Sequence, residues 1–156
     1  MDLEDLTGKI RKKWPEAVLG TGTFRNENTL QIRPEDILSV CRFLRDEPGL
    51  GFDYLVDLCG ADHLPREPRF EVIYHLRSLK TRELLRLKVP LPGPEPRISS
   101  VFSVWKAADW MEREAFDLFG IVFEGHPDLR RILLTPEWEG YPLRKDYPLR
   151  GKEETE

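Results

Sequence analysis

Glutamate, histidine and arginine gather in the last third of this sequence, where they could form an acid–base site or a set of ion pairs. The residues concerned are Glu112, Glu114, His126, Arg130, Arg131, Arg144, Lys145 and Asp146. Two carboxylates that face one substrate can serve as general acid and general base. A carboxylate beside an arginine instead forms a bidentate ion pair, which joins segments or proteins. The spacing of these residues distinguishes the two uses.

Glu112 and Glu114 fall on a helix that the sequence predicts for about residues 99–119. At about 100° per residue, both lie inside a mainly apolar arc, on nearly opposite sides of the helix. Carboxylates that diverge in this way cannot flank one substrate, so a catalytic pair is disfavoured. An unpaired buried carboxylate costs about 3–5 kcal/mol. Each glutamate therefore needs backbone donors or one of the candidate arginines, Arg130, Arg131 and Arg144.

Two roles stay open for these glutamates. Both could pair within the chain, or one could brace the C-terminal residues while the other meets a protein partner.

The other polar residues of the helix, Asp109, Arg113 and Asp117, recur at i, i+4 spacing and predict a self-paired, solvent-exposed stripe. The remaining positions are mainly apolar, so we expect the helix to be buried around most of its circumference.

Residues 124–150 have no periodic pattern, and their prolines prevent a long helix. Large apolar residues are nevertheless frequent, and a long loop of this composition must lie against something. Any of these apolar side chains that the core leaves exposed would form an apolar patch, which is typical of a partner site. Acidic and basic side chains balance here, which favours a protein partner over nucleic acid or anionic lipid. We predict that the partner-binding residues are Glu112, Glu114, His126, Arg130, Arg131, Arg144, Lys145 and Asp146.

Other chemistries find little support in the sequence. His126 stands between a glycine and a proline, and we interpret it as a turn histidine that donates to a backbone carbonyl, not a metal ligand. Cys41 and Cys59 are too few for a disulfide framework and are expected to be small buried hydrophobes. No phosphate-binding loop is present. We therefore predict no catalytic residue, cofactor or metal in this chain; a stand-alone hydrolase using Glu112, Glu114 or His126 is the competing hypothesis.

Composition limits the class of protein. The chain has 156 residues, of which 40% are hydrophobic and 33% charged, which indicates one globular unit with a sizeable core. A net charge of -4 argues against a dedicated nucleic-acid binder. Residues 1–5 do not resemble a signal peptide, and no run of about 18 apolar residues exists to span a bilayer. We expect membrane association only through a partner.

Hydrophobic periodicity predicts the scaffold. Helices are expected near residues 2–14 and 34–46, and strands near residues 18–24, 29–33, 52–58, 70–77 and 82–89. The residues around 78–81 predict a hairpin between the last two strands, and the proline-rich residues 90–96 predict an extended connector. One apolar face per strand indicates a sheet covered on one side; on the strand at 52–58, that face is expected to carry Phe52, Tyr54, Val56 and Leu58.

The predicted fold class is α+β. It has two layers, a mainly antiparallel sheet of about five strands with helices on one face, and an extended C-terminal segment. We divide the chain into an α+β domain, residues 1–120, and a C-terminal segment, residues 121–156.

Three stretches carry a resemblance to a known family. The first is Glu112–Glu114. The second consists of Asp117–Ile121 together with Phe123–Leu133, and the third is Gly140–Pro148. These residues resemble the signature of the 30 kDa (C-type) subunit family of proton-pumping NADH:quinone oxidoreductase, respiratory complex I. Phe116, Thr135 and Tyr141 depart from the residues usual in that family. The chain ends soon after the signature, so we expect any longer tail to be short or absent.

The resemblance implies a subunit of the hydrophilic arm, peripheral on the cytoplasmic side of the bacterial inner membrane. Members of the family hold no cofactor themselves, whereas the assembled complex uses NADH, FMN, iron–sulfur clusters and quinone. The implied partners are the large (D-type) subunit of the quinone site and the iron–sulfur subunits. The homologous subunit of a membrane-bound hydrogenase, or of a related quinone- or ferredoxin-linked complex, is the alternative.

Overall fold

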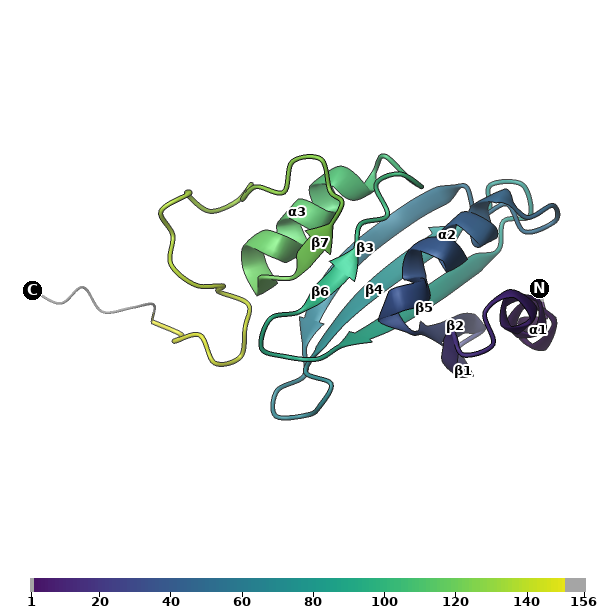
Figure 1. Cartoon of the computed structure of the whole chain (residues 1–156), viewed down its shortest axis with the longest axis horizontal. Coiled ribbons are helices and arrows are strands. Elements are labelled where there is room, and N and C mark those ends of the chain that lie inside the picture. Colours follow the sequence, from purple (N-terminus) through teal and green to yellow (C-terminus); the bar gives the residue numbers. More distant parts are fainter. Residues whose placement is uncertain (1, 151–156) are drawn as a thin grey trace, which may run out of the picture.

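Five strands form one mixed sheet, with helices packed against it, in a computed structural model that describes residues 2–150 (Figure 1). The sheet order is β1-β2-β5-β4-β3; β2 and β5 pair in parallel and the other neighbours are antiparallel. In chain order the elements are α1 (Leu3–Lys13), β1 (Val18–Phe24), β2 (Glu27–Ile32), the 3-10 turn η1 (Pro34–Asp36), α2 (Ile37–Asp46), β3 (Tyr54–Asp62), β4 (Phe70–Arg77), β5 (Leu84–Leu91), β6 (Arg97–Ser99), α3 (Ala108–Phe119) and β7 (Val122–Glu124).

The core lies on one face of this sheet. Alternate residues of β4 and β5 point into it and are fully or almost fully buried, among them Phe70, Val72, Tyr74, Leu87 and Val89. Cys41 of α2 and Ala115 of α3 belong to the same buried hydrophobic cluster as these strand residues, which places both helices on this face. Removal of this apolar surface from water is the main stabilising contribution to the fold. The predicted α+β class, with its mainly antiparallel sheet, is therefore confirmed.

The prediction for the third strand was wrong at two positions. The pairing of β3 with β4 shifts register between Leu55 and Asp57. Such a bulge places an extra residue in one strand and reverses the alternation beyond it. Leu55 and Leu58, on either side of the bulge, consequently both point into the core, and Val56 between them is exposed. Tyr54 precedes the bulge and is exposed because it is the neighbour of the inward-pointing Leu55. Beyond the bulge, the register also exposes Cys59, so the expectation of two buried cysteines holds only for Cys41.

The helix predicted for residues 99–119 begins later than expected. Residues 97–99 form β6, which pairs in parallel with β7, and α3 starts only at Ala108. Turns fill the interval, in which the Val104 and Trp105 amides both donate to the Val101 carbonyl. The two earlier helices and the β4–β5 hairpin are confirmed. The domain boundary at residue 120 stays a prediction, and residues 151–156 of the C-terminal segment lie outside the described residues.

Candidate functional site

The C-terminal segment folds back beside α3 and forms an open loop at the end of the molecule opposite α1 (Figure 1). Its main attachment is Asp117, whose side chain is fully buried. One carboxylate oxygen of Asp117 accepts three backbone N–H groups, those of Ile132 (3.0 Å), Leu133 (2.7 Å) and Leu134 (3.0 Å). The other oxygen accepts Nη1 of Arg131 at 2.7 Å. Asp117 therefore anchors a whole turn of the segment.

Asp117 had been expected on a solvent-exposed stripe, and that prediction was wrong. Helical spacing identifies the polar face of α3, but the returning segment covers this face. Burial would raise the pKa of Asp117, yet the three N–H donors and Arg131 outweigh it and lower the pKa. The carboxylate is thus charged at neutral pH, and it is held by four donors.

The segment also caps the C-terminus of α3. The last four carbonyls of a helix lack partners within the helix. Here the Gly120 amide donates to the Phe116 carbonyl at 2.8 Å, and Nη1 of Arg131 donates to the Asp117 carbonyl at 2.9 Å. The next two carbonyls, of Leu118 and Phe119, accept the Leu143 amide (3.1 Å) and Nε of Arg144 (2.7 Å). Two of these donors are cations, which complement the negative end of the helix dipole.

Gly120 makes this close approach possible. Its φ is +73°, in the left-handed region that favours glycine at a helix C-terminus. A Cβ at this position would lie 2.5 Å from the ring of Tyr141 and 2.7 Å from Nη2 of Arg144. The Arg144 guanidinium in turn lies over the rings of Phe70 and Tyr141, 4.9 and 4.8 Å from their centroids. Any larger residue at position 120 would push the segment off the helix.

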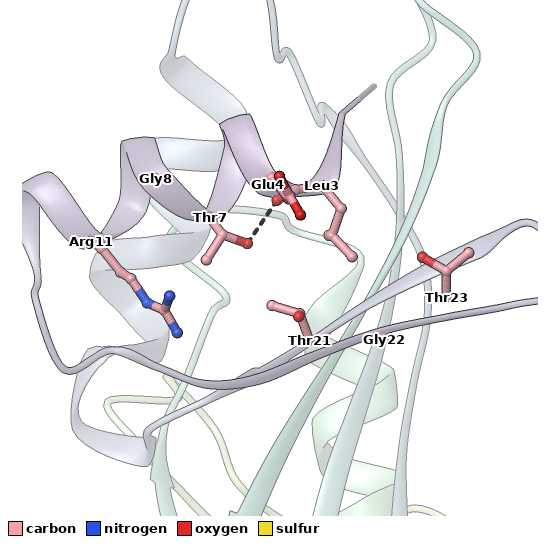
Figure 2. A pocket seen from close by; sticks show the side chains of 8 residues that line it. All are labelled: Leu3, Glu4, Thr7, Gly8, Arg11, Thr21, Gly22 and Thr23. Atoms are coloured by element: carbon pink, nitrogen blue, oxygen red, sulfur yellow. Dashed lines mark hydrogen bonds between the residues drawn. The ribbon is translucent and has the colours of Figure 1, made fainter.

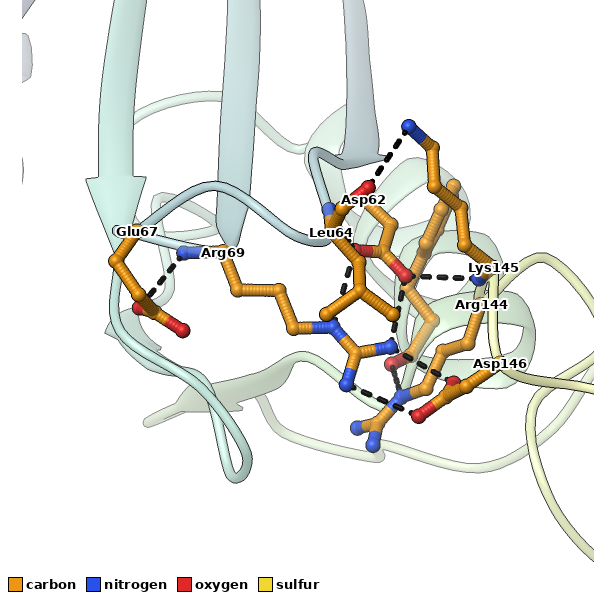
Figure 3. Close-up of polar contacts among 8 residues, drawn as sticks. Asp62, Leu64, Glu67, Arg69, Arg144, Lys145 and Asp146 are labelled. Carbon is orange, nitrogen blue, oxygen red and sulfur yellow. Dashed lines mark hydrogen bonds and ion pairs between the residues drawn. The ribbon is translucent and has the colours of Figure 1, made fainter.

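A second attachment links the segment to the β3–β4 loop (Figure 3). The Arg69 guanidinium lies between two carboxylates and donates to Asp62 at 3.0 and 2.8 Å and to Asp146 at 3.1 and 2.8 Å. The Lys145 amide also donates to Asp62, at 2.8 Å, and the Lys145 ammonium reaches the Leu64 carbonyl. The hydrogen bonds from Arg69 hold the pKa of Asp62 far below its usual range. Sequence reasoning missed Asp62 and Arg69, because nothing in their spacing relates them to residue 146.

Glu112 is buried as expected, but its partner is not an arginine. One oxygen accepts the Ser100 hydroxyl at 2.6 Å and the other accepts the Val101 amide at 2.7 Å. Burial raises the pKa of Glu112 to about 7, and these two hydrogen bonds only partly oppose that shift. The carboxyl thus secures the turn between β6 and α3. Of the partners expected for Glu112, the structure therefore has a backbone donor and not an arginine, because the late start of α3 leaves the Val101 amide beside the carboxylate.

Glu114 lies on the exposed face of α3, next to the exposed ring of Trp110. Within residues 2–150 no hydrogen bond or ion pair involves it. The prediction that Glu114 is buried and paired was therefore wrong. The returning segment lies on the Asp117 side of the helix and leaves this face open, so a partner can reach Glu114.

His126 is a turn histidine, as the sequence indicated. Its side chain is fully buried, and Nδ1 accepts the Asp128 amide at 3.0 Å. Nε2 therefore carries the proton of the neutral ring and donates to Asp109, whose backbone and carboxylate oxygens lie at 3.2 and 3.1 Å. Nearby, Arg130 forms an exposed ion pair with Asp128 at 2.7 Å. In the part of the chain that the structure describes, no group of three His, Cys, Asp or Glu residues is placed to hold a metal.

The predicted site residues thus serve different contacts rather than one reaction centre. Arg131, Arg144, Lys145 and Asp146 bind the segment to the core, Glu112 and His126 secure turns, and Glu114 and Arg130 face outward. A separate groove of about 600 Å³ between α1 and β1 is lined by Thr7, Arg11, Thr21 and their neighbours (Figure 2). It includes no residue that the sequence analysis named as a candidate site residue.

None of the helices in residues 2–150 is long and apolar enough to cross a bilayer.

These features define a class of protein: an α+β module that presents a clamped, irregular segment on one end. The family model for the respiratory-chain NADH dehydrogenase 30 kDa subunit matches residues 30–153, and the chain belongs to that family.

Relatives agree with this assignment. The chain is 48% identical over 153 residues to the C-type subunit of NADH-quinone oxidoreductase from Roseiflexus sp. (strain RS-1), covering 98% of this chain and 88% of that protein. It is 46% identical over 143 residues to the same subunit from Geotalea uraniireducens (strain Rf4), covering 92% and 86%. The family membership expected from the signature residues is confirmed.

Two solved structures are similar to this fold. A trypsin-resistant fragment (1–134) of Nqo5 is 32% identical, with a TM-score of 0.68, and the match covers 83% of this chain and all of that one. A chain of the membrane-bound sulfane sulfur reductase, an archaeal respiratory membrane complex, is 25% identical, with a TM-score of 0.75, and the match covers 94% and 85%.

Proposed function

We propose that this chain is a non-catalytic subunit of the hydrophilic arm of NADH:quinone oxidoreductase. In this role it supports assembly, and through assembly the transfer of electrons from NADH to quinone coupled to proton translocation. The observation that carries the proposal is the C-terminal segment: it lies within the family match, and it is fastened to the core by Asp117 and Asp62 instead of enclosing a reaction centre.

The outer surface of this segment supports a protein partner. Large apolar side chains are exposed on it and on the adjoining face of α3: Trp110, Leu133, Trp138 and Leu143. Several large exposed apolar side chains on one segment favour an interaction site there. We infer that the partners are the large (D-type) subunit of the quinone site and the iron–sulfur subunits. Contact with the membrane is then indirect, from a peripheral position on the cytoplasmic side.

We infer that the cofactors of the complex, FMN and the iron–sulfur clusters, reside in other subunits, together with the NADH and quinone sites. Of the three groups that a hydrolase could use, Glu112 and His126 are already engaged structurally, and only Glu114 is left without a partner within residues 2–150. Ser100 and Val101 hold Glu112, and Asp109 and Asp128 hold His126. The stand-alone hydrolase is accordingly the weaker hypothesis.

A second candidate is the homologous subunit of a membrane-bound hydrogenase or a related quinone- or ferredoxin-linked complex. The likeness to a chain of the membrane-bound sulfane sulfur reductase favours it, because the same fold occurs in that respiratory membrane complex. The higher identity to subunits of NADH-quinone oxidoreductase favours the first candidate.

Native purification distinguishes these proposals. A tag at the N-terminus leaves the C-terminal segment free, because α1 lies at the other end of the molecule (Figure 1). We expect the tagged chain to recover flavin- and NADH-binding subunits, identified by mass spectrometry, with NADH:quinone oxidoreductase activity. Recovery of a nickel–iron hydrogenase large subunit would support the second candidate. Recovery of the chain alone, with hydrolase activity, would overturn both.

A matched pair of variants tests the surface itself. Leu133 in the segment and Leu79 in the β4–β5 turn are equally exposed, 61% and 60%. Leu133→Asp should reduce recovery of the other subunits without a change in the melting temperature of the isolated chain, whereas Leu79→Asp should recover them fully. Equal recovery with both variants would remove the segment from the interface.

A further inference from the structure

A pocket lies between α3 and the C-terminal segment. Its volume is about 450 Å³, and its walls are Arg113, Phe116, Arg130, Arg131, Pro136 and Tyr141. Three arginines and two aromatic residues therefore line one pocket. The Arg131 guanidinium lies 5.1 Å from the Tyr141 centroid, and the Phe116 and Tyr141 centroids are 6.4 Å apart at an interplanar angle of 62°. Arginine beside aromatic surface is typical of anion recognition, because the guanidinium offers paired donors and the rings limit access of water.

The three arginines differ in how their charge is balanced. Arg131 pairs with Asp117 at 2.7 Å, and Arg130 pairs with Asp128 at 2.7 Å. Arg113 instead donates to neutral backbone oxygens, the carbonyls of Arg130 and Arg131, at 3.1 and 3.4 Å. Within residues 2–150 no carboxylate forms an ion pair with it, and its guanidinium lies 5.0 Å from the ring of Trp110. The pocket therefore keeps one positive charge without a directly paired counter-ion.

We infer that this pocket receives one carboxylate side chain, Asp or Glu, from a neighbouring subunit, and that Arg113 is its counter-ion. This inference rests on the proposed function and specifies how the segment is recognised. One unpaired cation accommodates one carboxylate, whereas a second anion would be repelled by Asp128 and Asp117. The match of charges would fix the register of the two proteins.

The surroundings of the pocket favour a protein side chain over a free anion. Two exposed apolar residues adjoin arginines of the pocket: Trp110 lies beside Arg113, and the Trp138 carbonyl accepts Arg131. A small anion needs neither of these, whereas a protein that delivers a carboxylate would cover them. Covering them also removes water from the ion pair, which strengthens it. The charged pair and its apolar rim then resemble the centre of a protein–protein interface.

Zero-length crosslinking in the purified complex tests the inference directly. Arg113→Lys keeps the positive charge and supplies an amine that a carbodiimide can join to a carboxylate in contact with it. We expect a crosslink from position 113 to an Asp or Glu of another subunit, located by mass spectrometry. The same treatment of the wild-type complex should not give this product. A crosslink from position 113 only to residues of this chain would overturn the inference.

Reversal of the charge at position 113 provides a second test of the inference. Arg113→Glu should lower recovery of the other subunits about tenfold or more, since two like charges would then meet. Arg42→Glu on α2 is the matched control, because Arg42 likewise donates to a neutral oxygen, that of Ser103. Recovery equal to wild type with Arg113→Glu would overturn the pocket while leaving the proposed function intact. Failure of the wild-type chain to recover any other protein of the complex would overturn the proposed function itself.

Titration of the isolated chain with inorganic phosphate separates a free anion from a partner side chain. We expect no Arg113-dependent heat. An Arg113-dependent heat together with no crosslink to another subunit would assign the pocket to a free anion instead.

Discussion

The Asp117 carboxylate and the Arg131 guanidinium meet at 2.7 Å and join α3 to a segment that begins after the helix has ended. The Asp117 side chain is fully buried and that of Arg131 is only 14% exposed, so loss of either group would leave the other charge without its counter-ion away from water. This pair, with the three amides that also bind Asp117, turns an irregular stretch of chain into a fixed surface.

Replacement of Asp117 by Asn should unfasten the segment. The amide keeps the shape of the side chain but removes the charge that balances Arg131. Breaking a buried ion pair by removing one partner costs about 3–5 kcal/mol. We expect a loss of this order in the free energy of unfolding measured by urea denaturation. Asp128→Asn, which breaks the exposed pair with Arg130, should leave it nearly unchanged. Equal effects of the two variants would contradict the central place of Asp117.

Replacement of Arg69 by Ala should destabilise the chain more than replacement of Asp146 by Ala. Without Arg69, the Asp62 side chain keeps its burial and loses its counter-ion, at a cost of about 3–5 kcal/mol. Without Asp146, Arg69 still pairs with Asp62, and Lys145 still ties the segment to Asp62, so only the bonds between Arg69 and the segment are lost. Urea denaturation should rank the variants in this order. Limited proteolysis of Asp146→Ala should show faster cleavage within residues 140–150.

The stability of the chain should fall as pH rises from about 5 to about 7, through Glu112. Its pKa is raised from 4.5 to about 7 in the folded chain, so the folded state binds a proton that the unfolded state releases over this interval. The contribution is full below pH 4.5 and is lost by about pH 7, roughly 3 kcal/mol in all. Glu112→Gln should flatten this part of the profile measured by denaturation. A variant profile parallel to wild type would contradict the raised pKa.

Replacement of Gly120 by Ala should detach the segment from the end of α3. The left-handed backbone costs a non-glycine residue about 1–2 kcal/mol, and the new Cβ would collide with Tyr141 and Arg144. We expect a lower melting temperature and a changed Trp138 fluorescence. Gly8→Ala is the control, because Gly8 lies within α1 and a Cβ there meets nothing within 4 Å. That change should stabilise the chain by about 0.5–1 kcal/mol.

Arg144 and Glu114 should separate stability from assembly. Arg144→Leu removes the donor to the Phe119 carbonyl, which is partly buried, and leaving it unsatisfied should cost about 1 kcal/mol. Glu114→Gln changes an exposed side chain and should leave the melting temperature of the isolated chain unchanged. If Glu114 meets a partner, its variant should instead lower recovery of the other subunits on native purification. Normal recovery would remove Glu114 from the predicted partner-binding residues.

Local patterns in the sequence predicted most of the scaffold. The apolar stripe of α2 and the alternation on β4 and β5 arise because each of these elements packs one face against the core. Hydrophobic periodicity alone therefore suffices to predict them. The bulge after Leu55 broke that rule, because an extra residue in one strand leaves no mark in composition. The start of α3 was misplaced because residues 100–107 are as apolar as a helix but form turns.

The candidate site was predictable in location but not in its contacts. The signature residues indicated where the segment lies and which charges it carries. The helical spacing of α3 could not show that residues 131–134 return to cover Asp117, since that contact depends on the path of a loop. Asp62 and Arg69 were missed for the same reason, as both are far in sequence from Asp146. Binding of a partner at the predicted residues stays a prediction.

The capping of α3 by the segment has a consequence for how the chain is made. The carbonyls of residues 117–119 accept donors from residues 131, 143 and 144, which leave the ribosome after the helix itself. The final turn of α3 can therefore be completed only after synthesis has passed those residues, whereas the pairing of the five strands needs nothing beyond residue 91. The surface that we propose to meet other subunits is consequently the last part of the described chain to form. A nascent chain cannot present that surface before its own fold is complete.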